Sequence, residues 1–293
     1  MRVAVLGASG KTGRFVAARL GDDGHTVVAV GRNAERLEAV DPRAERRIAD
    51  LAQPETVRRA LDGCARVVSL AHARHIAALL TALPDGCERV VVTGSIRART
   101  ALDDPAAAEV RGGEAAFREF QHGGACEAVL LHPSMIYGAP EDRSVGRILR
   151  LVRRWPRLLP VVLPLPDGGR HTVQPVFADD MVAAVAAAVT APDAPGPPID
   201  VAGPAPTTYA DMVRQCAAAM GRKAYVLPVP GGALARAVQL ARSIGVSLPV
   251  DAAEIRRAGE DKRVDVADMT ARLGVTPRPF AEGLRLKVER GWY

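Results

Sequence analysis

Aromatic and lysine residues are scarce in this 293-residue chain. Only 4% of its residues are Phe, Trp or Tyr, and only four of its 39 basic residues are lysines, at positions 11, 223, 262 and 287. No basic tract is interleaved with aromatic residues, so the stacking platforms of nucleic-acid-binding proteins are missing. We therefore expect no nucleic-acid partner. We interpret the formal net charge of +6 as a solvated arginine surface together with an anion-binding site.

Cysteines and long apolar runs are also few. The four cysteines, at positions 64, 87, 126 and 216, form no Cys-x-x-Cys pair, so we predict reduced, mostly buried thiols. His72 and His75 are three residues apart but lack further ligands, and we expect no metal. No apolar run is long enough to span a bilayer, and the first residues have the pattern of a strand, not of a signal peptide. These absences predict a cytoplasmic protein.

The most informative segment that is present is GASGKTG, residues 7–13. It follows an apolar run at residues 3–6 and leads into a helical pattern at residues 15–20. Gly7 permits a tight turn, Gly10 lets the backbone approach phosphates, and Gly13 lets helix and strand pack closely. The helix N-terminus offers N–H groups and a partial positive charge to an anion. The segment predicts a dinucleotide-binding loop, with further contacts from Ser9, Lys11 and Thr12.

Apolar strand-like runs alternate with helical patterns through the first two hundred residues. We predict strands at residues 3–6, 27–30, 47–49, 66–70, 89–93, 128–131 and 199–201. The predicted helices cover residues 34–40, 54–61, 74–83, 106–121 and 179–190. This alternation is typical of βαβ units, so we predict an α/β fold, a doubly wound parallel (Rossmann) sheet covered by helices on both faces.

The pattern changes after about residue 136, where joints rich in proline and glycine appear. We assign residues 1–135 plus 176–203 to the dinucleotide-binding domain. Residues 136–175 plus 204–293 are assigned to a smaller α-rich cap lobe, without new strands in the last seventy residues. Within this lobe, residues 145–165 have the pattern of a basic amphipathic helix. Such a helix covers the active-site cleft, packs against a partner subunit in an oligomer, or lies on a membrane surface.

The residue after the second strand distinguishes the two nicotinamide dinucleotides. An acidic residue there would bind the ribose 2′-hydroxyl of NAD, but this chain has Arg32 followed by Asn33. A guanidinium forms two charge-assisted hydrogen bonds with a phosphate, so Arg32 favours NADP(H) over NAD(H). After the third strand, Asp50 and Leu51 are expected beside the adenine, although Asp50 is equally suited to cap the next helix.

Several motifs in series resemble the extended and atypical short-chain dehydrogenase/reductase families. They are GASGKTGRFVAARL, VGRN and IADLAQPETVRRALDGCARVVSL, followed by VVVTGS, LLHPSMIYG and QPVFADDMVAAV. The later motifs are similar to the epimerase/dehydratase branch. Residues 137–185 also resemble bacterial relatives of the NADPH-holding accessory subunit of respiratory complex I. The resemblance implies a cofactor crevice at the carboxyl ends of the strands, with contacts from Ala71, Thr93 and Pro133.

The catalytic pair of that family is missing. Its usual tyrosine, followed four residues later by a lysine, has no counterpart here, because no lysine occurs between Lys11 and Lys223. If Glu114 matches the family's glutamate, Arg111 replaces the lysine. An arginine can bind a ribose or phosphate but is a poor proton shuttle. Acid-base catalysis by the usual tyrosine is therefore excluded.

Other residues remain candidates for chemistry. Ser95, after the fifth strand, matches the family's serine, and it is equally suited to cap a turn. His132 ends the sixth strand and can protonate a carbonyl, or it is a hydrogen-bonded histidine at a strand end. Tyr137 and Ser134 are expected on the substrate side of the cleft, or in the core.

Three functions fit these residues. The first is an NADPH-dependent oxidoreductase acting on a carbonyl or enone of a small, hydrophobic substrate, with Ser95, His132 or water supplying the proton. The second is a catalytically silent NADPH-binding structural subunit or redox sensor, which the missing pair favours. The third is a nucleotide-sugar epimerase or dehydratase, for which arginines in the cap lobe would hold the diphosphate.

Overall fold

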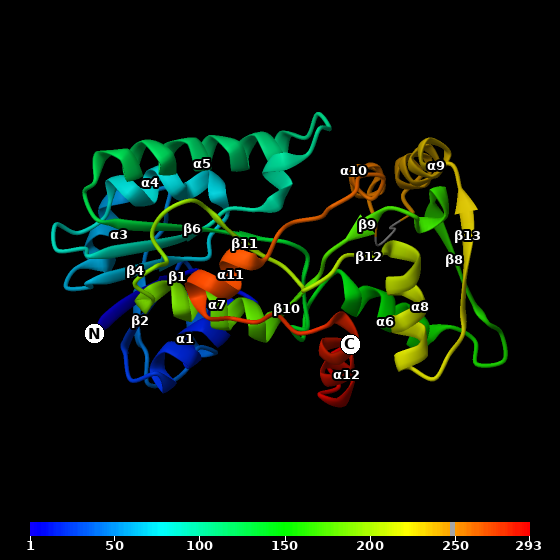
Figure 1. Cartoon of the computed structure of the whole chain (residues 1–293), viewed down its shortest axis with the longest axis horizontal. Helices are drawn as coiled ribbons and strands as arrows, with labels where there is room; N and C mark the ends of the chain where they lie inside the picture. The colour runs from blue at the N-terminus through cyan, green and yellow to red at the C-terminus, as the bar shows by residue number, and fades with distance from the viewer. Residues whose placement is uncertain (247–249) are drawn as a thin grey trace.

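A parallel sheet of seven strands forms the centre of the larger lobe (Figure 1). The computed structural model describes residues 1–246 and 250–293. The spatial order is β3-β2-β1-β4-β5-β6-β11, and every pairing is parallel. The strands are β1 (Arg2–Leu6), β2 (Thr26–Gly31), β3 (Glu45–Ile48), β4 (Arg66–Ser69), β5 (Arg89–Thr93), β6 (Glu127–Pro133) and β11 (Ile199–Val201). The predicted doubly wound sheet is confirmed, and all seven predicted strands are present.

Helices cover both faces of this sheet because its strands are apolar on both sides. In β1, Val3 and Val5 face one layer, whereas Ala4 and Leu6 face the other. The first layer contains α1 (Gly13–Asp22), α2 (Ala34–Glu38), α7 (Ala178–Thr190) and α11 (Ala267–Leu273). The second layer contains α3 (Pro54–Leu61), α4 (Ile76–Thr81) and α5 (Pro105–Gly123). Short 3₁₀ turns, η1 (Ala73–His75) and η2 (Ile96–Arg99), follow β4 and β5.

Local sequence signals explain the helix bounds. Pro54 and Pro105 occupy the first turns of α3 and α5, where a missing N–H costs nothing. The Asp104 side chain caps α5 by accepting from Ala106 N, and Gly124 ends the helix in a left-handed conformation (φ 65°).

The second lobe combines helices with three pairs of short strands. Its helices are α6 (Val145–Arg154), α8 (Tyr209–Ala219), α9 (Gly231–Ser243), α10 (Ala252–Arg257) and α12 (Phe280–Glu289). Three pairs of strands belong to this lobe. They are β7 (Ile136–Tyr137) with β10 (Val176–Phe177), β9 (Thr172–Val173) with β12 (Thr207–Thr208), and β8 (Val161–Pro166) with β13 (Ala224–Val229). The 3₁₀ turn η3 (Asp167–Gly169) follows β8. Among the described residues, no helix is long and apolar enough to cross a bilayer.

Three expectations about this lobe are wrong. Residues 145–165 do not form one helix, because α6 ends at Arg154 and β8 follows. The last seventy residues contain a strand, β13, which pairs with β8 in parallel. The helix α11 packs against β11 and α7 in the larger lobe, although its residues were assigned to the cap. In each case the partner is distant in sequence, so tertiary pairing decides the structure.

Candidate dinucleotide site and inter-lobe cavity

The glycine loop has the conformation that its sequence predicts. Gly7 adopts a positive φ of 77°, and its N–H donates to Val30 O at 3.0 Å. A Cβ at Gly10 would lie 3.0 Å from Gly7 O, and one at Gly13 only 2.1 Å from the same atom. A side chain at Gly13 would therefore separate α1 from the turn. Beside the loop, a Cβ on Gly7 would lie 3.4 Å from the Leu70 carbonyl carbon and 3.5 Å from Ala71 N.

The end of β2 presents Arg32 to solvent. Among the described residues, Arg32 forms no hydrogen bond or ion pair, so its guanidinium is free to bind an anion. Ser9 lies nearby, since its Oγ is 3.4 Å from the position of a Cβ on Gly31. Burial, together with the charges of Arg74, His72 and Arg32, lowers the pKa of His75. Arg32 and Arg74 therefore both place positive charge near His75 at this edge of the sheet.

The other residues predicted for the adenosine side have local bonds. Asn33 caps α2, with its Oδ1 accepting from Arg36 N at 2.9 Å. Asp50 Oδ1 accepts from Ala52 N at 3.0 Å in a local turn, but Asp50 does not cap the next helix, because the N-cap position of α3 is Gln53. Leu51 packs against the core. These residues therefore shape the edge of the sheet through backbone contacts, and Arg32 and Ser9 offer the freer polar groups.

Lys11 connects the glycine loop to the second lobe. Its Nζ donates to the carbonyl oxygen of Glu141, in the segment between β7 and α6. Lys11 and Thr12 line a cavity of about 380 Å³ together with Met135, Arg143 and other residues of that segment. The second lobe therefore covers the end of the glycine loop that carries Lys11 and Thr12.

A larger cavity of about 1130 Å³ lies between the lobes. Ser95 and Ser134 border it from the ends of β5 and β6. The Ser95 Oγ accepts from Arg97 N at 3.2 Å and caps η2, so the capping alternative is realised while the hydroxyl still faces the cavity. Thr93 lies just before it, with Oγ1 donating to Ser69 O at 3.2 Å. Pro133 is buried at the end of β6.

Cations line one side of this cavity and aliphatic side chains line the other. Three arginines of α6 are spaced three or four residues apart, which puts them on one helix face, and a fourth lies just before the helix. They are Arg143, Arg147, Arg150 and Arg154. The aliphatic side comes from β8, α9 and α10, with Leu163, Leu165, Leu234, Val238 and Ile255. Arg143 and Arg154 form no hydrogen bond or ion pair with any described residue.

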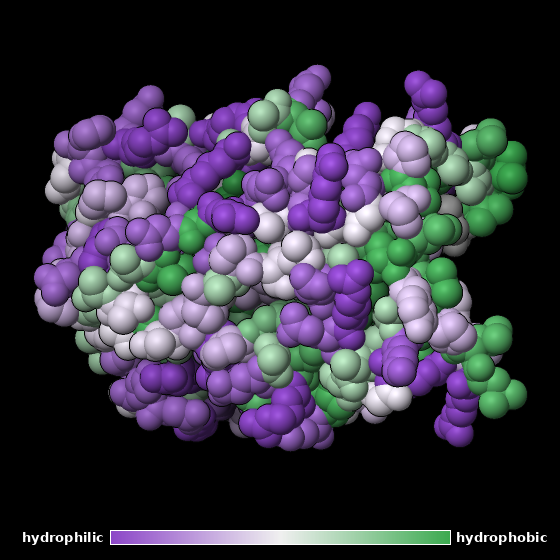
Figure 2. Space-filling model, turned by 45° about the vertical axis from the view of Figure 1, so that its right-hand side comes forward, coloured by the Kyte–Doolittle hydropathy of each residue, from purple (hydrophilic) through white to green (hydrophobic). Residues whose placement is uncertain are grey.

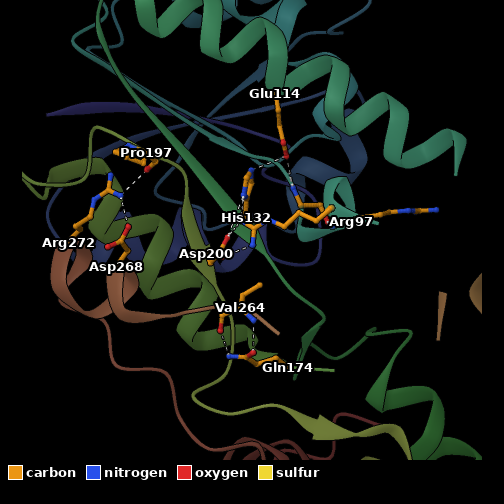
Figure 3. A network of polar contacts seen from close by, with 11 residues as sticks. Arg97, Glu114, His132, Gln174, Pro197, Asp200, Val264, Asp268 and Arg272 are labelled. Atoms are coloured by element: carbon orange, nitrogen blue, oxygen red, sulfur yellow. Dashed lines mark hydrogen bonds and ion pairs between the residues drawn. The ribbon is translucent and has the colours of Figure 1, made fainter. Parts of the chain in front are cut away.

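A buried polar cluster surrounds His132 (Figure 3). Its Nε2 lies 3.0 Å from Glu114 Oε1 and its Nδ1 lies 3.5 Å from Asp200 Oδ1. Asp200 also accepts two bonds, of 2.7 and 2.5 Å, from Arg99. Burial disfavours the imidazolium, but the bonds to Asp200 and Glu114 outweigh burial and raise the pKa of His132.

This cluster does not support the predicted role of His132 as proton donor. The imidazole is nearly fully buried, lies between two carboxylates and does not line the large cavity. Glu114 also accepts from Ser95 N at 3.4 Å. The histidine therefore ties the ends of β6 and β11 to α5, below the cavity floor, as the alternative of a hydrogen-bonded histidine at a strand end requires.

Tyr137 and Arg111 are not at the cavity either. Tyr137 is fully buried, its hydroxyl donates to Phe280 O at 3.0 Å, and its ring contacts Phe177 and Phe280. Burial raises the pKa of Tyr137 far above its usual value, so it cannot serve as an acid-base group. Arg111 lies on the exposed side of α5 and donates to Ala98 O at 3.2 Å, which holds η2.

Sequence reasoning missed a buried ion pair between Lys287 and Asp142. Lys287 Nζ lies 2.9 Å from Asp142 Oδ2 and donates to Ala139 O at 2.8 Å. Asp142 further accepts from the N–H groups of Gly138 and Gly146. The rarity of lysine and the position of Lys287 on the apolar face of α12 could have indicated a buried cation. The sequence does not show that Asp142 is its partner, because only the fold brings the two residues together. No three His, Cys, Asp or Glu side chains in the described part of the chain form a metal-binding group.

The glycine loop and strand order define a fold of the Rossmann type. Residues 7–119 match the model of the family described as NAD(P)H-binding. Over these residues, the chain is therefore similar to NAD(P)H-binding domains. No curated protein sequence matches the chain significantly.

Solved structures share the fold over the whole chain. A short-chain dehydrogenase/reductase superfamily protein from Agrobacterium tumefaciens with bound NAD is 18% identical, with a TM-score of 0.72 over 99% of this chain and 97% of that one. The UDP-glucose 4-epimerase of Thermus thermophilus in complex with NAD is 21% identical, with a TM-score of 0.73 over 99% and 98%. An epimerase from Methanothermobacter thermautotrophicus is 17% identical, with a TM-score of 0.75 over 99% and 93%.

Proposed function

We propose that the chain is an NADPH-dependent oxidoreductase that reduces a carbonyl or enone without the Tyr/Lys pair. The observation that carries this proposal is the position of the large cavity, which begins at the ends of β5 and β6. It shares Met135, Arg143 and Ser144 with the smaller cavity that reaches Lys11 and Thr12 of the glycine loop. In a doubly wound fold, the ligand crevice lies at these strand ends. The cavity volume of about 1130 Å³ accommodates a small-molecule substrate.

When bound, reduced nicotinamide supplies two electrons as a hydride, and the substrate oxygen or carbon then needs one proton. Ser95 is the side chain in the best position to transfer it. Because its Oγ accepts from Arg97 N, the hydroxyl hydrogen remains available to a ligand in the cavity. Water is the alternative source, since His132 is enclosed and Tyr137 is buried. The Ser95→Ala variant should lower kcat if the hydroxyl takes part.

The preference for NADPH is supported by Arg32. An Arg32→Glu substitution should raise the Kd of NADPH at least tenfold, because two charge-assisted bonds are replaced by repulsion. The Kd of NADH should change little. Fluorescence titration with both dinucleotides measures this, and Arg36→Glu, one turn into α2, is the matched control. An equal loss for NADPH and NADH would show that Arg32 does not contact the phosphate.

We further propose that the substrate is aliphatic and carries an anionic group. The arginine-bearing face of α6 and the aliphatic side chains lie on different sides of the cavity. An amphipathic anion could bind the arginines with its charged group and pack its apolar part against the aliphatic side chains. A panel of paired carbonyl compounds, each as a carboxylic acid and as its neutral amide, tests this. Arg154→Gln should raise KM for the acids and leave KM for the amides unchanged.

Two other functions stay open to test. A catalytically silent NADPH-binding subunit or redox sensor is favoured by the burial of Tyr137 and the enclosure of His132. Tight NADPH binding without turnover of any carbonyl, unaltered in Ser95→Ala, would establish it. A nucleotide-sugar epimerase or dehydratase is favoured by the cavity arginines, which suit a diphosphate. Conversion of a UDP-sugar in the presence of added dinucleotide would establish that function.

A further inference from the structure

Two segments of the cap lobe carry basic residues and no acidic ones. Residues 143–166 and 212–250 together contain 11 of the 39 basic residues and none of the 33 acidic residues. In the rest of the chain, 28 basic residues accompany all 33 acidic ones, so the remainder is net negative. The two segments form α6, β8, most of α8, β13 and α9 in the second lobe, and β8, β13 and α9 lie at the end of the molecule farthest from the sheet (Figure 1). The chain is therefore electrically polarised along its length.

Exposed aliphatic and aromatic side chains gather at the same end. Leu158 is 98% exposed, Ile244 72% and Leu240 67%. Figure 2 shows apolar side chains projecting from this end of the molecule on both sides of a hollow. We call this surface the apolar tip, and it comprises Leu158, Leu159, Val162, Tyr225, Leu227, Leu240 and Ile244.

The apolar tip is held in place by the fold. The strands β8 and β13 pair with Val162 opposite Tyr225, so both side chains lie on the exposed face. Arg222 donates to the carbonyl oxygens of Pro156 and Leu159, each at 2.8 Å, and fixes the loop that carries Leu158. The opposite face of β8 presents Leu163 to the cavity. This small sheet is thus apolar on both faces, and its outer face lacks a cover among the described residues.

We propose that the apolar tip docks the chain on the surface of an anionic lipid bilayer. The exposed side chains would enter the interface, and the surrounding cations would attract the lipid headgroups. A second copy of the chain is the competing occupant. Arg147 and Arg214 pair with Glu254 and Asp211, but the two segments keep an excess of positive charge. Two such tips in contact would bring like charges together, so charge opposes that pairing and favours a negatively charged partner.

The test is co-sedimentation of the purified full chain with vesicles, which requires no dinucleotide and is therefore independent of the proposed function. Vesicles of phosphatidylcholine alone are compared with vesicles of phosphatidylcholine and phosphatidylglycerol. The chain should bind the anionic vesicles and be released as the salt concentration rises. Substituting Leu158→Ser and Leu159→Ser together should weaken binding about tenfold or more. Both side chains are exposed, so folding should be unaffected.

Two matched controls distinguish vesicle binding through the apolar tip from nonspecific vesicle binding. Ile48→Ser alters an aliphatic residue that is 56% exposed on β3, in the other lobe, and should not change vesicle binding. Arg157→Glu should weaken binding, whereas Arg118→Glu on α5 should not. Equal binding to neutral and anionic vesicles would overturn the proposal. So would absence of vesicle binding, with or without a dimer that the leucine substitutions disrupt.

Discussion

Gly13 shows how closely the glycine loop is packed at the scale of one residue. A Cβ there would lie 2.1 Å from Gly7 O and 2.9 Å from Ala8 Cα. We expect Gly13→Ala to push α1 away from β1 and to weaken NADPH binding more than tenfold, with a loss of about 2 kcal/mol in unfolding free energy. Fluorescence titration and urea unfolding measure the two effects.

Gly112 is the matched control for that prediction. It lies in α5 with open space where a Cβ would be, so Gly112→Ala should leave NADPH binding intact and stabilise the chain by about 0.5–1 kcal/mol. If both alanine variants bind NADPH like the unmodified chain, the loop does not hold the dinucleotide as proposed.

His132 makes the stability of the chain depend on pH. Because the folded state raises the pKa of His132 above its ordinary value of about 6.5, its contribution to stability is fully present below that value. The contribution is lost as pH rises through the folded-state pKa. The difference in unfolding free energy between the unmodified chain and His132→Gln should therefore be largest near pH 6 and shrink at higher pH.

Urea unfolding at several pH values tests this prediction. His122→Gln, an exposed substitution near the end of α5, is the control and should leave the pH profile unchanged. A difference for His132→Gln that is constant with pH would mean that the imidazole does not take up a proton on folding.

The candidate site was partly predictable at this scale. Gly7 and Gly13 have the predicted backbone roles because a glycine loop between a strand and a helix is specified within a few consecutive residues. His132 and Tyr137 were placed near the cleft because they lie at the end of β6 and just after it, but their burial depends on partners far along the chain. The carbonyl oxygen of Phe280 accepts a hydrogen bond from the Tyr137 hydroxyl, and the Asp200 carboxylate contacts the His132 imidazole. The positions of Phe280 and Asp200 in the sequence do not predict these contacts.

At the scale of secondary structure, the parallel sheet was easier to predict than the cap. Strands such as β5 are continuous apolar runs bounded by turns, and this pattern belongs to a strand that is covered on both faces. The run at 161–166 is also apolar, but it follows α6 closely and contains prolines, so its pairing with β13 was not visible. The short strands β7, β9, β10 and β12 have two residues each and carry no periodic signal.

Lys287 connects α12 to the segment before α6 through its ion pair with Asp142. Lys287→Met keeps the length of the side chain but leaves Asp142 without its buried cation, which should cost about 3 kcal/mol in unfolding free energy. On the same helix, Arg285→Met breaks an exposed pair with Glu289 and should cost less than about 0.5 kcal/mol. Urea unfolding compares the two variants. An equal loss of unfolding free energy in the two variants would show that burial does not make the Lys287–Asp142 pair stronger than the Arg285–Glu289 pair.

At the scale of the whole molecule, the two lobes are joined by chain segments that meet at one side chain. Gln174 lies between β9 and β10, and its Nε2 donates to Gly203 O at 2.7 Å and Val264 O at 3.1 Å. Its Oε1 accepts from Val264 N at 3.0 Å (Figure 3). Gly203 and Val264 lie where the chain passes from one lobe to the other, and Gln174 lies just before β10 and α7, which lead into the larger lobe. The large cavity depends on this junction, because its walls come from both lobes.

Gln174→Ala should therefore weaken the connection between the lobes. It removes three buried hydrogen bonds, and we expect a loss of about 2–4 kcal/mol in unfolding free energy and faster proteolysis near residues 203 and 264. Gln174→Glu should be at least as harmful, because it turns a carboxylate oxygen toward two carbonyl groups. The exposed Gln239→Ala on α9 is the control and should change neither measurement. Loss of stability without new cleavage near the junction would show that Gln174 supports one lobe rather than the connection between them.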